Sequence, residues 1–282
     1  MTLIDGKKIA ADIRGELRER AVAFEERCGK KIGLAVVLVG QDPASQVYVK
    51  NKIKGCSEIG IRSFSHYLPD TATQAEVLQL ITELAKDENV HGILVQLPLP
   101  KHLDAKMLLA AIPPQKDVDG FGAENIGKLA LNETSTVACT PLGVMELLKR
   151  YDISVKGKRA VVLGRSNIVG RPMAMLLLNA DATVTVCHSA TENIREECKR
   201  AEILIAAVGK PKFVTADMVK PDAVVIDVGI NRDECGNLCG DVDFEAVRNV
   251  ASYITPVPGG VGPMTISMLL SNTVKAAERL FR

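Results

Sequence analysis

Short apolar runs rich in β-branched residues alternate along this chain with stretches of helical periodicity. In the first half, the runs "IGLAVVLVG" and "GILVQLPLP" carry apolar residues on both faces of the strands they would form. Strands buried on both faces are typical of parallel sheets, which helices cover on either side. The alternation therefore predicts an α/β fold built from consecutive βα units.

The alternation is interrupted once, after "KDVDGF", and resumes at "CTPLGVMELLKRY". There, Thr140 as N-cap and Pro141 in the first turn predict the start of a helix. Beyond it the runs "RAVVLG", "ATVTVCHS", "EILIAAVG" and "AVVIDVGI" alternate with helical stretches. Because 282 residues exceed the usual single-domain size of roughly 100 to 200, we expect two domains, residues 1–120 and 140–260.

The balance of charges excludes two classes of partner. Lys and Arg number 35 against 34 Asp and Glu, and the formal net charge is +1. The chain therefore lacks the long-range field that draws proteins onto nucleic acid or anionic lipid. No apolar run approaches the roughly 20 residues that span a bilayer, and the first residues do not resemble a signal peptide. We expect no nucleic-acid partner and no membrane partner.

The seven cysteines are odd in number and lack paired spacing. Such a set predicts free thiols in a reducing compartment, and hence a cytoplasmic protein. Cys235 and Cys239 lie closest together, in "DECGNLCGD", whose Gly and Asn are typical of a surface hairpin. Since no second Cys or His pair lies nearby, the segment lacks the pattern of a zinc site, and we expect no bound metal.

The segment "AVVLGRSNIVGRP" predicts a buried strand, a glycine turn and a helix. In the usual dinucleotide fingerprint, glycines at the first, third and sixth positions let the backbone approach a pyrophosphate at the helix N-terminus. Here Gly164 keeps the tight turn, Ser166 replaces the second glycine, and Gly170 falls one position late. The turn is thus a variant, and by itself it is also compatible with an ordinary βα connection.

The end of the next strand favours NADP over NAD. His188 and Ser189 stand there, where an NAD site would carry the acidic residue that binds the adenine ribose. No carboxylate stands at that strand end to repel a 2′-phosphate, and Arg165 offers a planar, permanently charged partner for one. The alternative is that Arg165 is a solvated surface residue.

Several polar residues of the first half could converge on one crevice. Tyr48 and Lys52, four residues apart in "SQVYVKNKIKGC", share one face of a predicted helix. Gln96 ends the buried strand "GILVQLPLP", and ligands collect beyond the carboxyl ends of parallel strands. Asp117 and Asp119 follow in "KDVDGF". The alternative is a half-buried tyrosine, a solvated stripe of lysines and two turn-forming aspartates.

Five segments in this order resemble a known family: "YVKNK", "GILVQLPLP", "KDVDGF", "VVLGRSNIVGRP" and "ITPVPGGVGPMT". Over essentially its whole length the chain resembles the bifunctional methylenetetrahydrofolate dehydrogenase/methenyltetrahydrofolate cyclohydrolase family of the FolD type. The resemblance implies two α/β domains flanking a cleft, the second a Rossmann-like NAD(P)-binding domain, with a final helix over 264–282 packed back on the first. It also implies a homodimer, tetrahydrofolate substrates and NADP as cofactor.

The resemblance implies roles for individual residues as well. Lys52 is similar to the catalytic lysine of the family and Gln96 to the partner that orients it. Tyr48 is similar to the residue that packs on the folate, and Asp119 to the carboxylate that binds the amino edge of the pterin. Further substrate contacts are implied at Val95, Leu97, Pro258, Gly259, Gly260, Val261, Gly262 and Pro263. Cofactor contacts are implied at Gly164, Arg165, Ser166, Ser189 and Ile230, and we expect His188 near the ribose phosphate.

The two reactions of that family make different demands on the protein. When 5,10-methylenetetrahydrofolate is oxidised, the neighbouring nitrogens stabilise the charge left on the carbon, so the step requires mainly positioning, worth roughly 7 to 11 kcal/mol. Hydrolysis of the methenyl cation to 10-formyltetrahydrofolate requires a base for the attacking water and an acid for the ring nitrogen. Burial beside a cationic substrate disfavours the charged form of a lysine, so we expect Lys52 to serve as that base.

Two other functions stay open on the residues alone. An NADP dehydrogenase of another small metabolite would need a proton carrier, but His66, His91 and His102 have no evident partner and are expected to be structural. A non-catalytic NADP-binding protein would keep the fold without turnover, because fold does not determine function. The intact set of polar residues in the first half argues against it.

Overall fold

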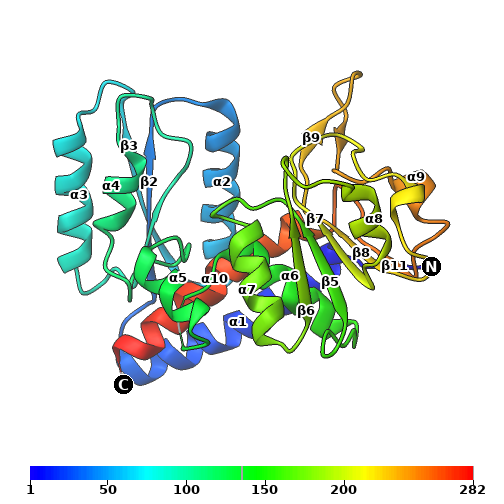
Figure 1. Cartoon of the computed structure of the whole chain (residues 1–282). Helices are drawn as coiled ribbons and strands as arrows, with labels where there is room; N and C mark the ends of the chain where they lie inside the picture. Colours follow the sequence, from blue (N-terminus) through cyan, green and yellow to red (C-terminus); the bar gives the residue numbers. More distant parts are fainter. Residues whose placement is uncertain (135, 282) are drawn as a thin grey trace. The chain divides into compact units, whose positions relative to one another are not determined.

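The computed structural model describes residues 1–134 and 136–281 of the chain. These residues group into two compact units (Figure 1). The three-stranded unit comprises Ala11–Cys139 and Ile266–Arg282, and the six-stranded unit comprises Met1–Ala10 and Thr140–Thr265. The first ten residues thus group with the second half of the chain, although the sequence pattern places them in the first domain.

The sheet of the three-stranded unit has the order β3-β2-β4, with β2 (Gly33–Val39) between β3 (Arg62–Leu68) and β4 (Gly92–Val95). Both pairings are parallel. All seven residues of β2 are buried, which confirms that this run forms a central strand covered on both faces. A further parallel bridge joins Ile93 to Asp117, so the chain leaving the sheet runs along its β4 edge.

Helices cover both faces of this sheet (Figure 1). On one side lie α3 (Gln74–Lys86) and α4 (Ala105–Ala110), which enclose an apolar core with β2 and β4. On the other side lies α2 (Pro43–Glu58). The carboxyl end of β4 and the length of α2 therefore belong to one layered unit, in which their side chains can meet.

Two long helices, α1 (Gly6–Cys28) and α10 (Val261–Leu280), run side by side in Figure 1. Arg20 of α1 donates hydrogen bonds to both carboxylate oxygens of Glu278 of α10, over 3.1 and 2.7 Å. Most of α1 and most of α10 belong to the three-stranded unit. The short helix α5 (Ala123–Ala130), which follows the sheet in the chain, belongs to the same unit.

The sheet of the six-stranded unit has the order β1-β11-β8-β7-β5-β6, and all its pairings are parallel. From β5 the chain passes outward to β6 and then returns across β5 to β7. Such a reversal is a topological switch point, and open α/β sheets bind ligands beyond the carboxyl ends of the strands there. The strands are β1 (Thr2–Leu3), β5 (Arg159–Leu163), β6 (Thr183–Cys187), β7 (Ile203–Ala206), β8 (Val224–Asp227) and β11 (Tyr253–Ile254).

The helices of this unit are α6 (Cys139–Arg150), α7 (Gly170–Asn179), α8 (Ile194–Lys199), α9 (Phe244–Val247) and the 3-10 turn η1 (Ala216–Met218). Of these, α7 connects β5 to β6 and packs on both strands. The segment "DECGNLCGD" forms the predicted hairpin, because β9 (Asn231–Arg232) pairs antiparallel with β10 (Leu238–Cys239). In the part of the chain that the structure describes, no helix is long and apolar enough to cross a membrane.

Two helices begin earlier than the sequence pattern predicts. α6 begins at Cys139, so Thr140 lies inside its first turn rather than at the N-cap. The Thr140 hydroxyl instead lies 2.9 Å from that of Thr265, a partner distant in the sequence that no local pattern reveals. α10 begins at Val261, three residues before the predicted start. Pro263 fits its first turn, where the N–H that proline lacks would have no helical acceptor.

Candidate active site

A hydrogen bond joins Lys52 of α2 to Gln96 at the end of β4. Lys52 Nζ donates to Gln96 Oε1 over 2.9 Å. Gln96 is 8% exposed, and its Nε2 donates to Leu97 O over 2.6 Å. Because this carbonyl holds the amide nitrogen, the amide oxygen faces the lysine. This hydrogen bond uses one N–H of the lysine amine, and its remaining hydrogen-bonding capacity is left for a ligand.

Tyr48 lies one helical turn before Lys52 on α2 and is 46% exposed. Its neighbour Val49 is buried, so the helix is anchored while the tyrosine remains accessible. The start of α2 is set by Asp42, whose carboxylate accepts a hydrogen bond from a backbone N–H of the first turn. An accessible aromatic ring beside a polar pair offers a flat surface for a ring-shaped ligand.

The first aspartate of "KDVDGF", Asp117, has a structural role. Its carboxylate accepts hydrogen bonds from Gly120 N, Gly122 N and Asn125 Nδ2, over 2.8 to 3.0 Å. Three donors occupy it, and they shape the turn that follows Asp119. The sequence alone does not distinguish Asp117 from Asp119, whereas the structure shows that they differ in their hydrogen-bond partners.

Asp119 retains the capacity to accept hydrogen bonds from a ligand. Desolvation raises the pKa of its carboxyl to about 6, although the nearby positive charge of Lys52 lowers it. The negative charge of Asp117 raises this pKa further. Asp119 as a whole residue is of intermediate exposure, and the thiol of Cys139 lies 3.8 Å from its Oδ1. Lys52, Gln96 and Asp119 therefore form one interacting group within the three-stranded unit.

In the six-stranded unit, Gly164 and Gly170 stand where no side chain fits. Gly164 follows β5 with φ +106°, and a Cβ on it would overlap the carbonyl oxygen of Ala207, directly after β7. Gly170 begins α7, and a Cβ there would overlap the carbonyl oxygen of Gly164. Strand, turn and helix therefore close tightly at the switch point. The late glycine of the motif is the one that lets α7 approach the turn.

Ser166 and Arg165 lie between these glycines. Ser166 Oγ accepts hydrogen bonds from Val169 N and Gly170 N, over 3.2 and 3.4 Å, and so orders the start of α7. Arg165 is exposed and has no ion-pair partner among the residues that the structure describes. Together with Arg171 it lines a hollow of about 440 Å³ beside α7 and β6. A guanidinium that no carboxylate neutralises is available to an anion.

The loop after β6 lies next to this turn, because Gly164 N donates to the last residue of β6 over 2.8 Å. His188 organises the loop: its ring Nδ1 accepts from Ala190 N over 3.2 Å, and its backbone N–H donates to Thr191 Oγ1 over 2.9 Å. Ser189 is exposed. Neither His188 nor Ser189, which follow the end of β6, is a carboxylate; Glu192 lies later in the same loop.

Two predicted contact regions meet in a pocket of about 160 Å³ beyond the carboxyl end of β8. Ile230, which is 54% exposed, lines one side. The segment 258–263 lines the pocket as well, and Lys7 and Leu238 are among the other lining residues. The structure thus brings together residues that are about thirty positions apart in the sequence.

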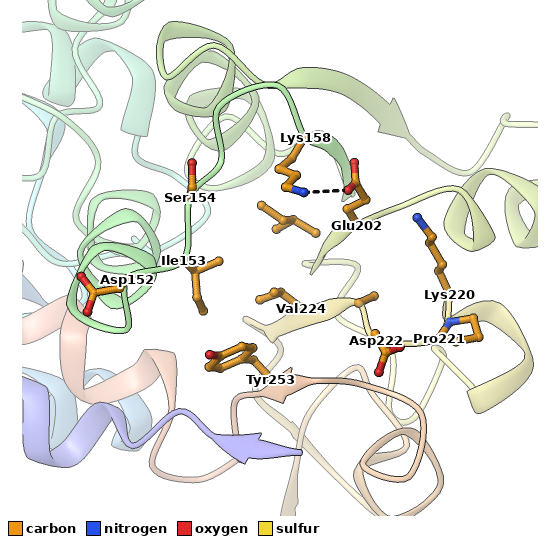
Figure 2. A pocket seen from close by; sticks show the side chains of 12 residues that line it. Asp152, Ile153, Ser154, Lys158, Glu202, Lys220, Pro221, Asp222, Val224 and Tyr253 are labelled. Carbon is orange, nitrogen blue, oxygen red and sulfur yellow. Dashed lines mark hydrogen bonds and ion pairs between the residues drawn. The ribbon is translucent and has the colours of Figure 1, made fainter.

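A larger cavity of about 370 Å³ lies at the opposite edge of the same sheet (Figure 2). It is lined at the amino ends of the strands, by Lys158 before β5, Glu202 before β7 and Val224 at the start of β8, with Tyr253 beside them. Lys158 donates to Glu202 over 3.0 Å. Because ligands of parallel sheets bind beyond the carboxyl ends, this cavity is not the predicted cofactor site. No predicted site residue lines it.

Two buried aspartates that the sequence analysis does not single out hold the loops at the carboxyl edge. Asp227 ends β8 and accepts three backbone N–H bonds of 2.9 Å. Burial nevertheless raises the pKa of its carboxyl to about 7. Asp241 accepts from the backbone N–H groups of residues 208–210, over 2.6 to 3.0 Å. An aspartate that ends an apolar strand, as in "AVVIDVGI", is the signal that could reveal this pair.

These two units define a class of protein: a nucleotide-dependent enzyme with a dinucleotide turn at a switch point and a separate lysine, amide and carboxylate group. Comparison with known families specifies it further. Residues 138–281 match the NAD(P)-binding domain of the tetrahydrofolate dehydrogenase/cyclohydrolase family, and residues 4–119 match its catalytic domain. The chain belongs to this family.

Individual relatives are similar over the whole chain. The bifunctional protein FolD of Campylobacter curvus is 58% identical over 278 residues, which cover 99% of this chain and 96% of the relative. The crystal structure of the bifunctional enzyme FolD from Campylobacter jejuni covers 99% of both chains, with a TM-score of 0.98 and 53% identity. The Trypanosoma brucei FolD structure, complexed with NADP cofactor and inhibitor, covers 100% of this chain and 99% of its own, with a TM-score of 0.95 and 42% identity.

The chain is accordingly a methylenetetrahydrofolate dehydrogenase (NADP+) and methenyltetrahydrofolate cyclohydrolase. The predicted family, α/β fold class, NADP cofactor and pair of activities are confirmed. The two alternatives left open by the residues, another NADP dehydrogenase and a non-catalytic NADP-binding protein, are excluded.

Gly164→Ala is expected to weaken NADP binding roughly tenfold or more, because a methyl group at φ +106° would meet the carbonyl of Ala207 and open the turn. Gly127→Ala is the matched control. It lies in α5, where a Cβ meets no atom within 4 Å, so NADP affinity should not change and the melting temperature should stay equal or rise. Calorimetric titration with NADP measures both variants. Equal affinities would refute the role of the turn.

Proposed function

We propose that Lys52, Gln96, Tyr48 and Asp119 bind and process the folate in the two reactions that this enzyme catalyses. These are the NADP-dependent oxidation of 5,10-methylenetetrahydrofolate to 5,10-methenyltetrahydrofolate, and its hydrolysis to 10-formyltetrahydrofolate. The observation that carries the proposal is the hydrogen bond of 2.9 Å from Lys52 Nζ to Gln96 Oε1. It holds an amine beside a carboxylate that this amine influences electrostatically.

In the oxidation, NADP supplies the nicotinamide ring that accepts the hydride. The nitrogens of the substrate stabilise the charge left on the carbon, so no side chain has to remove a proton. The protein contributes position, worth roughly 7 to 11 kcal/mol when two reactants are held in a reactive arrangement. Tyr48 would pack on the folate, with Val95 and Leu97 beside it. Ile230 and the segment 258–263 would line the region where folate and nicotinamide meet.

In the hydrolysis, one group must take a proton from the attacking water and return one to the ring nitrogen. We assign this work to Lys52. An amine without its extra proton can accept one from the attacking water and then return one to the ring nitrogen. Gln96 Oε1 requires one N–H of the amine to point toward it, so the lone pair points elsewhere. The hydrogen bond therefore orients the base as well as placing it.

Asp119 would accept hydrogen bonds from the amino edge of the pterin. A carboxylate accepts two such N–H groups more strongly when it is ionised. Since desolvation raises the pKa of this carboxyl to about 6, it carries its charge at neutral pH and loses it in more acidic solution. On this proposal folate binding weakens as the pH falls through about 6.

Lys52→Met removes the amine and keeps the length of the side chain. We expect cyclohydrolase activity to fall about 100-fold or more, the usual contribution of a general base, while dehydrogenase activity stays measurable because hydride transfer needs no base. Lys50→Met, an exposed position on the same helix, is the control. The absorbance of NADPH formed and the decay of methenyl absorbance follow the two steps. Equal loss of both activities, with folate still bound, would contradict this division.

We also propose that Arg165 recognises the 2′-phosphate of NADP. Its support is a guanidinium without an ion-pair partner among the described residues, together with His188 and Ser189 at the end of β6, where an NAD site would carry an acidic residue. Ser189, exposed in the loop after β6, can donate its hydroxyl to the same phosphate, and His188 holds the loop in place. Gly164, at the start of the turn, allows a pyrophosphate to approach the start of α7.

Arg165→Ala is expected to weaken NADP binding by roughly tenfold or more and NAD binding by less than about twofold, because only NADP carries the phosphate that the guanidinium would contact. Arg159→Ala removes an equal charge at the opposite edge of the sheet, at the start of β5, and serves as control. Dissociation constants of both nucleotides measure the effect. Parallel losses for NADP and NAD would rule out the 2′-phosphate contact.

We further propose that the protein is a homodimer that associates through β6. This strand ends the six-stranded sheet, and no strand of the described residues pairs with its outer edge. An open edge presents unpaired backbone groups to a second chain. Leu178 of α7 and Val186 of β6, which are 62% and 37% exposed, line the same hollow beside it. If the β6 edges of two chains paired, Leu178 and Val186 of each chain would be covered.

Replacing Leu178 and Val186 together by lysine is expected to produce a monomer at concentrations where the unchanged protein is a dimer, because charge on an edge strand opposes pairing. Leu131→Lys, at a position 72% exposed, places an equal charge outside the edge and should leave the dimer intact. Sedimentation velocity distinguishes the species. An unchanged protein that sediments as a monomer would overturn the proposal.

We place the protein in the cytoplasm, without a nucleic-acid partner. All seven cysteines are free and four of them are buried, as suits a reducing compartment. The formal net charge of +1 gives no general attraction for polyanions. Cell fractionation and a gel shift with mixed DNA and RNA at low salt test these two statements. Recovery in another compartment, or binding of either nucleic acid, would contradict them.

A further inference from the structure

Cys139 is a buried thiol next to the proposed folate carboxylate. It is 3% exposed, and its Sγ lies 3.8 Å from Asp119 Oδ1 and 3.4 Å from Val118 O, both within reach of a thiol donor. Burial raises the pKa of this thiol well above its usual value, so the sulfur keeps its proton at neutral pH. A thiol that stays protonated beside a carboxylate is a hydrogen-bond donor rather than a nucleophile.

Asn272 of α10 limits where that proton can point. Its Nδ2 donates to Val118 O and Val137 O, each over 2.9 Å, and lies 3.7 Å from Cys139 Sγ. The amide nitrogen carries only donors, so its two N–H groups are shared among the two carbonyls and the sulfur. The thiol has two acceptors in reach: Val118 O at 3.4 Å, which also accepts from Asn272, and Asp119 Oδ1 at 3.8 Å. Asp119 is the stronger acceptor when it is ionised.

We propose that Cys139 is a positioning residue for folate binding, whose thiol donates to Asp119 Oδ1, orients the carboxylate and leaves Oδ2 for the substrate. This inference rests on the proposed role of Asp119 in binding the pterin. Asn272 takes part in this arrangement, because its amide contacts the sulfur although it lies on α10, 133 residues further along the chain. Through Asn272, α10 thus helps to shape the candidate site of the three-stranded unit.

The effect of the Cys139 thiol on the pKa of Asp119 can be separated from the effects of the other neighbouring groups. Around Asp119, desolvation raises the pKa of the carboxyl, the ammonium of Lys52 on α2 lowers it, the carboxylate of Asp117 raises it, and the thiol of Cys139 at the start of α6 lowers it. Loss of the thiol therefore raises this pKa while the other three influences remain. Folate binding should then weaken at a higher pH than in the unchanged enzyme.

The experiment is the pH dependence of kcat/KM for methylenetetrahydrofolate with saturating NADP, measured on the full-length enzyme. In Cys139→Ala the acidic limb should move to higher pH by about 0.5 unit or more, and KM for the folate near pH 6 should rise severalfold. KM for NADP and kcat in alkaline solution should not change. Cys139→Ser keeps a donor, so its acidic limb should stay closer to that of the unchanged enzyme.

Cys198→Ala is the matched control, because it removes an equally buried thiol from the core of the six-stranded unit. It should lower stability without moving the acidic limb. Two results would overturn the role of Cys139: an acidic limb in Cys139→Ala that coincides with that of the control, or equal shifts in the Ala and Ser variants.

Asp119→Asn distinguishes a failure of this inference from a failure of the proposed function. An unchanged KM for folate in Asp119→Asn would overturn the role of Asp119 itself, and the inference about Cys139 with it. If Asp119→Asn binds folate poorly at every pH while Cys139→Ala behaves like the control, only the role of Cys139 is overturned.

A spectroscopic measurement needs no change at Cys139. The S–H stretching band in the Raman spectrum should move to lower frequency as Asp119 ionises near pH 6, because a donated S–H bond weakens. The shift should be absent in Asp119→Asn. A band that is independent of pH in both proteins would overturn the proposal even if Cys139→Ala did not fold.

Discussion

On the proposed function, the hydrogen bond between Lys52 and Gln96 gives the three-stranded unit its chemistry. It connects α2 to the carboxyl end of β4. Because Leu97 O holds the other end of the amide, the acceptor oxygen cannot turn away from the lysine. Without this bond, Lys52 would be one of several lysines on α2. With it, a single amine is placed beside a carboxylate whose pKa it lowers.

The six-stranded unit depends on a different constraint, the close approach of backbone to backbone. Gly164 faces the chain after β7, and Gly170 faces Gly164, so the turn has no space for a Cβ at either position. This explains why a motif that departs from the usual glycine spacing still forms a tight connection from strand to helix. Ser166, where the usual motif has glycine, accepts hydrogen bonds from the backbone N–H groups of Val169 and Gly170 at the start of α7. The departure changes which group orders the helix start, and it leaves the packing intact.

Buried polar side chains hold both units at the edges where ligands would bind. Asp117 shapes the turn beside Asp119, and Asp227 with Asp241 shapes the loops beyond β7 and β8. Each of these carboxylates is occupied by backbone donors, so it gives shape rather than chemistry. Asp119 is the exception, since its neighbours are a thiol and an amine instead of backbone N–H groups.

Periodicity and local motifs were enough to predict the α/β class, the central position of β2, the hairpin of β9 and β10, and which polar residues stand at strand ends. These features depend on residues close together in the sequence, where alternation and turn chemistry have direct physical consequences. Only the tertiary structure decided that Asp117 is saturated while Asp119 is not, that Thr140 lies inside α6, and that Asn272 reaches Cys139. Each of these depends on partners that are remote in the chain or on the paths of neighbouring backbones. No local pattern specifies such contacts, because they arise only when separate elements pack together.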